Sequence, residues 1–195
     1  MMSYPDTKFV TSAADARQLA ADTGREVAFA GRSNAGKSSA LNAITEHPGL
    51  ARVSRTPGRT QLINFFELAP ARRLVDLPGY GYAKVPERVR ARWHALMEHY
   101  FNVRESLAGL MLIVDSRRGV GSQDAAMLEW MLARERPVHI LLSKSDKLNR
   151  GEAQRVLRET ESRWRDPALS VQLFSAHARH GIDEARSVLE RWLAA

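Results

Sequence analysis

One octapeptide limits the possible folds of this chain more than any other feature. Residues 31–38 read Gly-Arg-Ser-Asn-Ala-Gly-Lys-Ser and fit the pattern G-x-x-x-x-G-K-[ST] of a phosphate-binding loop. The run Glu26–Ala30 before it is typical of a strand, and Ser39–Thr45 after it is typical of a helix. Because glycines let the backbone curl and a helix N-terminus attracts anions, this segment predicts a site for nucleotide phosphates.

The rest of the chain alternates short apolar runs with segments of helical period, which indicates a mostly parallel sheet flanked by helices. The link Ala69–Arg72 is too short for a parallel crossover, so the strands on either side of it form an antiparallel pair. We predict an α/β fold of the three-layer P-loop NTPase class, with a six-stranded, mostly parallel sheet and one antiparallel edge strand. The predicted strands are Glu26–Ala30, Gln61–Leu68, Arg73–Asp76, Gly109–Asp115, Val138–Ser143 and Val171–Ser175.

The N-terminal segment lies outside this alternation. Ser12 is a candidate N-cap, and Thr11–Ala21 is predicted to be a short helix. The 195 residues contain no linker and no internal repeat, so we expect one domain, with residues 1–23 packed on a nucleotide-binding domain that spans 24–195. The four tryptophans fall in predicted helices, where their spacing favours a role in the core over base stacking.

A second motif indicates contacts to a metal ion and to the γ-phosphate. Asp76-Leu77-Pro78-Gly79 ends a predicted strand in the form D-x-x-G. Such an aspartate can hold a Mg²⁺ water while the glycine N–H meets the γ-phosphate. Within the first motif, Lys37 supplies a positive charge for the phosphates, and the Ser38 hydroxyl is a hard oxygen ligand for Mg²⁺.

The loop Arg55–Thr60 offers another Mg²⁺ ligand. A threonine there can close over the metal when the γ-phosphate is present, and we favour Thr60 over Thr56 because Thr60 adjoins the strand predicted to begin at Gln61. A turn threonine without any ligand is the alternative interpretation. We expect Lys37, Thr60 and Gly79 to act on the γ-phosphate during hydrolysis.

Two further strand ends indicate guanine as the base. In Ser143-Lys144-Ser145-Asp146, the Asp146 carboxylate can accept hydrogen bonds from guanine N1–H and the 2-amino group, donors that adenine lacks. The Lys144 stem can lie along the base plane, whereas the serine that opens this tetrapeptide replaces the usual Asn or Thr. Phe174-Ser175-Ala176 ends the last predicted strand, and the Ala176 N–H can donate to guanine O6.

This combination resembles the EngB/YihA/YsxC family of bacterial ribosome-biogenesis GTPases over nearly the whole chain. The segments that carry the resemblance are GRSNAGKSSALN at Gly31–Asn42, TPGRTQ at Thr56–Gln61 and DLPGYGYAKVP at Asp76–Pro86. The resemblance implies GTP binding, Mg²⁺ held by Ser38 and Thr60 with Asp76 acting through water, and a role in large ribosomal subunit maturation linked to cell division and septation. The nucleotide contacts it implies are Gly31, Arg32, Ser33, Asn34, Ala35, Gly36, Lys37, Ser38, Gly58, Arg59, Thr60, Gln61, Leu62, Asp76, Leu77, Pro78, Gly79, Ser143, Lys144, Ser145, Asp146, Phe174, Ser175 and Ala176.

A net charge of +7 and a pI near 10.2 favour anionic partners, nucleic acid first among them. An arginine-rich genome composition is the alternative explanation of this charge. Arg88 and Arg92 share one face of a predicted helix near the switch loops. There they can make the affinity for RNA depend on the bound nucleotide, although they also fit a solvated helix face. The other basic residues in or near the predicted switch loops are Lys84, Arg90, Arg52, Arg55 and Arg59.

Three function classes fit a phosphate loop. The first is an assembly factor that docks on ribosomal RNA in its GTP state. The second is a signalling switch that acts on a protein partner, but the C-terminal Trp192–Ala195 offers no cysteine for a lipid anchor. The third is a kinase or ATPase, which Asp146 disfavours. With no export signal and no apolar run of membrane length, we expect a cytoplasmic monomer with neither DNA nor a membrane as partner.

Hydrolysis by the isolated protein is expected to be slow, and faster in potassium than in sodium buffer. Tyr80 stands where Ras-like proteins carry a water-orienting glutamine. Asn34 is similar in position to the potassium-liganding asparagine of related GTPases, in which K⁺ supplies the charge of an arginine finger; a loop-shaping role is its alternative. The rate of phosphate release, measured in matched sodium and potassium buffers, tests both the slow intrinsic rate and the stimulation by potassium. Equal rates exclude the potassium site, and fast hydrolysis in both buffers contradicts the slow intrinsic rate.

Overall fold

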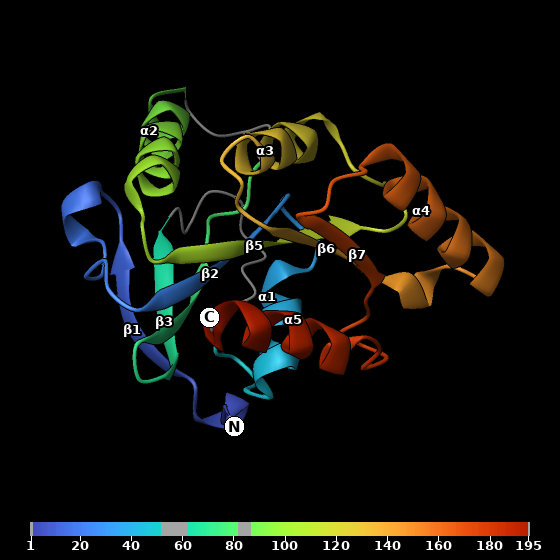
Figure 1. Cartoon of the computed structure of the whole chain (residues 1–195), viewed down its shortest axis with the longest axis horizontal. Coiled ribbons are helices and arrows are strands. Elements are labelled where there is room, and N and C mark those ends of the chain that lie inside the picture. Colours follow the sequence, from blue (N-terminus) through green and yellow to red (C-terminus); the bar gives the residue numbers. More distant parts are fainter. Residues whose placement is uncertain (1, 52–61, 82–86, 195) are drawn as a thin grey trace.

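The central element of the fold is strand β2 (Arg25–Gly31), which leads directly into the predicted phosphate loop. A computed structural model describes residues 2–51, 62–81 and 87–194. It contains a seven-stranded sheet of order β1-β3-β4-β2-β5-β6-β7, in which β3 alone runs against the other strands (Figure 1). The other strands are β1 (Lys8–Ala13), β3 (Ile63–Ala69), β4 (Arg72–Asp76), β5 (Leu107–Asp115), β6 (Val138–Ser143) and β7 (Leu169–Leu173).

Helices cover both faces of the sheet and make three layers (Figure 1). In β2, Val27 and Phe29 point into one core while Ala28 and Ala30 point into the other, as the two-residue period of a strand requires. None of the helices in the described parts of the chain combines the length and apolar character needed to cross a membrane. The helices are α1 (Lys37–Thr45) and α5 (Ile182–Ala194) on one face, α2 (Glu87–Val103), α3 (Ser122–Leu132) and α4 (Arg150–Arg163) on the other, and the short 3-10 helices η1 (Tyr4–Asp6), η2 (Ala16–Gln18) and η3 (Ser145–Lys147).

The predicted fold class is confirmed, with a sheet of seven strands where six were predicted. Each of the six predicted strands has a counterpart, although Gln61 itself lies outside the described residues. The tryptophans do pack against the cores: Trp93 and Trp130 against the core under α2 and α3, and Trp192 against the core on the opposite face.

The predicted helix at Thr11–Ala21 is wrong. Its first three residues end strand β1, which pairs antiparallel with β3, and only the short η2 is helical. The strand carries Phe9 and Val10 side by side, residues that suit a pleated surface, and Ser12 Oγ donates to Asn64 Oδ1 of β3 at 2.7 Å. Since β1 lies outside β3, the one antiparallel strand is second from the edge and not the edge strand that the sequence predicted.

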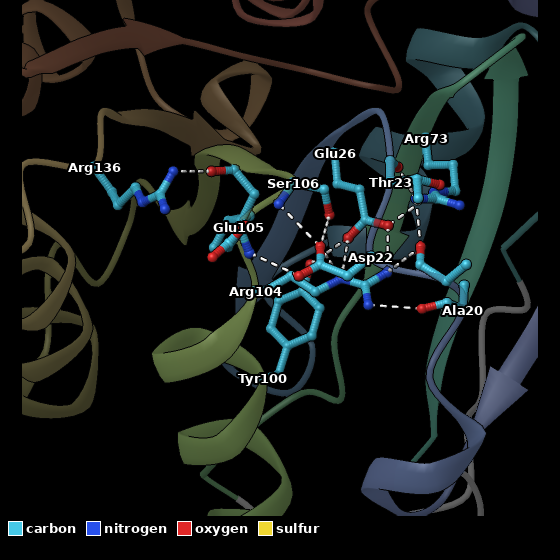
Figure 2. A network of polar contacts seen from close by, with 12 residues as sticks. Ala20, Asp22, Thr23, Glu26, Arg73, Tyr100, Arg104, Glu105, Ser106 and Arg136 are labelled. Atoms are coloured by element: carbon cyan, nitrogen blue, oxygen red, sulfur yellow. Dashed lines mark hydrogen bonds and ion pairs between the residues drawn. The ribbon is translucent and has the colours of Figure 1, made fainter.

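A buried charge cluster fixes the amino end of β2, the end far from the phosphate loop (Figure 2). The Glu26 side chain is fully buried and accepts hydrogen bonds from Arg104 Nε at 2.9 Å and Arg104 Nη2 at 2.7 Å. Arg73 Nε of β4 lies 2.8 Å from Glu26 Oε1. Arg104 directly follows α2, so one carboxylate holds β2, β4 and the end of α2 together.

The same two arginines bind the segment that precedes β2. Arg104 Nη1 donates to Ala20 O at 2.7 Å (Figure 2), and Arg73 Nη2 donates to Ala21 O at 2.8 Å. Asp22 accepts hydrogen bonds from the Ser106 N–H at 3.0 Å and the Ser106 hydroxyl at 2.5 Å, directly before β5. These contacts tie the Ala20–Asp22 segment to the charge cluster and to the residue that precedes β5.

Removal of one member of this cluster should destabilise the protein strongly. Arg104→Ala leaves the buried Glu26 carboxylate with half of its cationic partners, so we expect the free energy of unfolding to fall by about 3–5 kcal/mol. Arg155→Ala is the control, because Arg155 pairs with Glu159 at 3.9 Å on the exposed face of α4 and should change stability by less than about 0.5 kcal/mol. Urea unfolding compares the two variants, and equal small losses would contradict the prediction.

Candidate functional site

The predicted phosphate loop leaves the carboxyl end of β2 and enters α1. A Cβ on Gly31 would lie 2.6 Å from Ile113 O of β5, and Gly36 has a φ of +102° at the N-cap of α1, so both positions need glycine. The N–H groups of Lys37 and Ser38 have no hydrogen-bond acceptor among the described residues. These donors lie at the positive end of α1 and suit a bound phosphate.

Parallel pairing brings the second motif beside this loop. Asp76 ends β4 opposite Phe29 of β2, and its carboxylate accepts a hydrogen bond from Lys37 Nζ, with 11% of each side chain exposed. A Cβ on Gly79 would lie 3.5 Å from Ser33 Cα, so the D-x-x-G turn packs on the phosphate loop. The structure therefore joins the lysine predicted for phosphate and the carboxylate predicted for the metal.

A cavity of about 600 Å³ opens between these two segments and strand β3. Ser38 and Asp76 both line it. A hydroxyl and a carboxylate supply the oxygen ligands that Mg²⁺ prefers, so these residue types fit the metal. Gly58, Arg59, Thr60 and Gln61 lie outside the described residues. The predicted contacts that line the cavity are Arg32, Ser33, Asn34, Gly36, Lys37, Ser38, Leu62, Asp76, Leu77, Pro78 and Gly79.

The segment predicted to face the base is tied to the phosphate loop. The Ser143 hydroxyl, at the end of β6, donates to Ala35 O at 2.5 Å, and Lys144 Nζ donates to Asn34 O at 2.5 Å. The serine that departs from the usual Asn or Thr thus keeps a hydroxyl that bonds the loop. These residues lie outside the lining of the cavity, which covers the phosphate half of the predicted site.

The two segments predicted to bind guanine contact each other. The Ser175 hydroxyl donates to Asp146 Oδ1 at 2.6 Å, and the Ser145 hydroxyl donates to Phe174 O at 3.0 Å. The hydrogen bond from Ser175 lowers the pKa of Asp146, so the side chain is a charged acceptor at neutral pH. Strand β7 ends one residue before Phe174, and Phe174–Ala176 therefore belongs to the loop that follows it.

Tyr80, the residue after D-x-x-G, is buried beneath α3. Its hydroxyl donates to Asp124 Oδ1 at 2.5 Å, and Asp124 Oδ2 accepts the Gly121 N–H at 2.9 Å. Burial raises the pKa of Tyr80 far above its ordinary value, so the hydroxyl stays protonated and donates. Tyr80 does not line the cavity, and its contact with α3 was not foreseen from the sequence.

The sequence interpretation also missed Asp115, at the end of β5. Asp115 Oδ2 accepts hydrogen bonds from Lys144 Nζ at 3.0 Å and Arg117 Nη2 at 2.7 Å. Burial alone would raise the pKa of Asp115, but the bonds from Arg117 and Lys144 outweigh it and hold that pKa well below the ordinary range. A signal was present, because Asp115 ends an apolar strand next to β2 just as Asp76 does.

The basic residues predicted to contact RNA are only partly described. Arg88 and Arg92 are exposed on α2. The Arg90 side chain, Lys84, Arg52, Arg55 and Arg59 lie outside the described parts of the structure. An RNA contact through these side chains stays a prediction.

Comparison with known proteins agrees with this geometry. The family described as 50S ribosome-binding GTPase matches residues 26–144. A probable GTP-binding protein EngB from Coxiella burnetii (strain CbuG_Q212) is 50% identical over 192 residues, which cover 97% of this chain and 94% of the relative. The chain belongs to the EngB family of GTP-binding proteins. As a member of the EngB family it is a GTPase, with GTP and GDP as its ligands.

Other EngB proteins extend the comparison. The probable GTP-binding protein EngB of Xanthomonas euvesicatoria pv. vesicatoria (strain 85-10) is 51% identical over 190 residues, which cover 95% of this chain and 91% of the relative. The crystal structure of a probable GTP-binding protein engB aligns with a TM-score of 0.71 at 21% identity, over 87% of this chain and 98% of that one. At this identity the structural match supports the fold.

Asp146→Asn should change the base preference of this EngB-family protein from guanine toward xanthine. The variant loses the charged side chain predicted to accept hydrogen bonds from guanine N1–H and the 2-amino group, so we expect GDP affinity to fall by about 50-fold and xanthosine diphosphate affinity to rise. Fluorescent-nucleotide titration measures both. Asp183→Asn, whose side chain is fully exposed at the start of α5, is the control. Unchanged GDP affinity in Asp146→Asn would contradict this role of Asp146.

Proposed function

We propose that this EngB-family GTPase is a slow, magnesium-dependent switch in the assembly of the large ribosomal subunit, needed for normal cell division and septation. The observation that carries the switch is the contact between Lys37 and Asp76. One residue is predicted to bind phosphate and the other to face the metal, and they lie in one cavity. A ligand that engages either side chain must therefore affect the other.

Nucleotide phosphates would compete with Asp76 for the Lys37 ammonium. In the structure this ammonium bonds a carboxylate, whereas a triphosphate offers more negative charge next to the N–H groups of α1. Transfer of Lys37 to the phosphates would leave Asp76 free to face a cation. Mg²⁺, held by Ser38 and Thr60 with Asp76 acting through water, would neutralise charge on the phosphates.

The D-x-x-G turn is the element proposed to report the nucleotide state. Tyr80, directly after this turn, makes two hydrogen bonds with the phosphate loop, from the Ser33 N–H to Tyr80 O at 2.7 Å and from the Tyr80 N–H to Gly31 O at 3.3 Å. The Gly79 N–H is proposed to meet the γ-phosphate, which only GTP carries. A change at Gly79 would then reach the residues that lead toward α2.

The ribosomal part of the proposal rests on charge and on family. The chain carries a net charge of +7, Arg88 and Arg92 are exposed on α2, and the matching family is described as 50S ribosome-binding. Together these support an RNA-rich partner that the GTP state would recognise. A signalling switch that acts on a protein without RNA is the alternative, and its binding would depend little on salt.

Co-sedimentation with ribosomal subunits tests this proposal. We expect the protein to pellet with the large subunit in the presence of a GTP analogue, less so with GDP, and more weakly as salt rises. Arg92→Ala should lower the salt dependence by about one phosphate contact, whereas Arg155→Ala on α4 should not. Absence from the pellet in every nucleotide state would exclude the ribosomal role, and salt-insensitive binding would favour a protein partner.

A further inference from the structure

Lys144 is held in an unusual conformation by contacts on two sides. Its backbone φ is +58°, a left-handed value that is unfavourable for a residue with a Cβ. Its ammonium donates to Asn34 O of the phosphate loop at 2.5 Å and to Asp115 Oδ2 of β5 at 3.0 Å. The side chain is 31% exposed, so an unheld ammonium would have ready access to water.

Asp115 is buried and holds more than this lysine. Its side chain is 8% exposed. Oδ1 accepts hydrogen bonds from the Arg117 N–H at 3.1 Å and from Arg117 Nε at 2.9 Å, which leaves the Oδ2 lone pairs for Lys144 Nζ and Arg117 Nη2. Parallel pairing of β5 with β6 places Asp115 opposite Ser143 in register, immediately before Lys144 in the chain. The geometry is therefore built into the sheet.

We propose that Asp115 is a positioning residue for guanine-nucleotide binding, because it fixes the Lys144 side chain against the phosphate loop. This inference rests on the proposed role of Lys144 beside the base. It adds the end of β5 to the two segments already assigned to the guanine half of the site. In this proposal Asp115 acts on the nucleotide through Lys144.

The physical basis is preorganisation. A lysine side chain loses conformational entropy when it is ordered. If a fixed acceptor already orders it in the free protein, nucleotide binding does not carry that entropy cost. Two charge-assisted hydrogen bonds at one ammonium define its position better than the single backbone acceptor Asn34 O can. Without Asp115, binding of the nucleotide would have to order Lys144 itself, so affinity would fall.

The chain contains a matched control for this carboxylate. Asp15-Ala16-Arg17 repeats the local arrangement of Asp115-Ser116-Arg117: Asp15 Oδ1 accepts the Arg17 N–H at 2.9 Å, and Oδ2 lies 3.5 Å from Arg17 Nη2. That turn is exposed, and no lysine is paired with Asp15 among the described residues. Asp15→Asn therefore removes the same charge from the same kind of turn without affecting a lysine.

The test is a double-mutant cycle of Asp115→Asn and Lys144→Met, with GDP as the probe. Asparagine keeps an acceptor for the Arg117 N–H, and methionine keeps most of the apolar stem. We expect Asp115→Asn to weaken GDP binding by about tenfold through faster dissociation, to raise KM for GTP, and to change kcat little. Asp15→Asn should bind GDP normally. In the Lys144→Met background, Asp115→Asn should have no further effect.

The outcomes separate the two levels of inference. If Lys144→Met itself binds GDP normally, the proposed role of Lys144 fails and this inference falls with it. If Lys144→Met binds GDP weakly but Asp115→Asn binds normally, only the inference about Asp115 is overturned. Additive losses in the double variant would show a structural effect independent of Lys144 and also overturn it. Asp115→Glu keeps the charge and should retain affinity within about threefold, which covers the case in which Asp115→Asn does not fold.

Discussion

Parallel pairing of β2 with β4 on one side and with β5 on the other is the constraint on which the whole site depends. The registers place Phe29 opposite Asp76 and Gly31 opposite Ile113. Because the carboxyl ends of parallel strands meet at one edge of the sheet, side chains that are far apart in the sequence lie close together there. The close approach of Gly31 to Ile113 O shows how tightly this edge is packed.

The opposite ends of the same strands are held by charge. Glu26, Arg73 and Arg104 are buried together at the amino ends of β2 and β4, where ionised groups are unfavourable unless each finds a partner. The ion pairs among these three residues fix the position of β4, which leads into the D-x-x-G turn, and of the end of α2. The strand that carries the phosphate loop is thus anchored at its base by ion pairs, while its other end is open for a ligand.

How much was predictable depended on how local each signal was. The phosphate loop, Asp76–Gly79 and Ser143–Asp146 are short segments whose residue types carry their own chemistry, and the structure connects all three. The end of strand β1 was mistaken for the start of a helix, because the conformation of this strand depends on pairing with β3, which lies far along the chain.

Residues that act through distant partners were not predictable in this way. Glu26 and Arg104 look like ordinary surface charges until the fold buries them together. Asp115 did carry a visible signal, since it ends an apolar strand beside β2, but no motif gave it a role. Its proposed positioning role comes from its contact with Lys144 in the structure.

Strand β1 also has a consequence for how this protein meets other chains. An open strand offers unpaired N–H and C=O groups that invite a second molecule to extend the sheet, and aggregation often begins there. Here the chain covers β3 with its own N-terminal residues, and the covering strand carries Lys8 and a bulge between Phe9 and Thr11, two devices that discourage intermolecular pairing. Any partner that recognised β3 by strand addition would first have to displace β1.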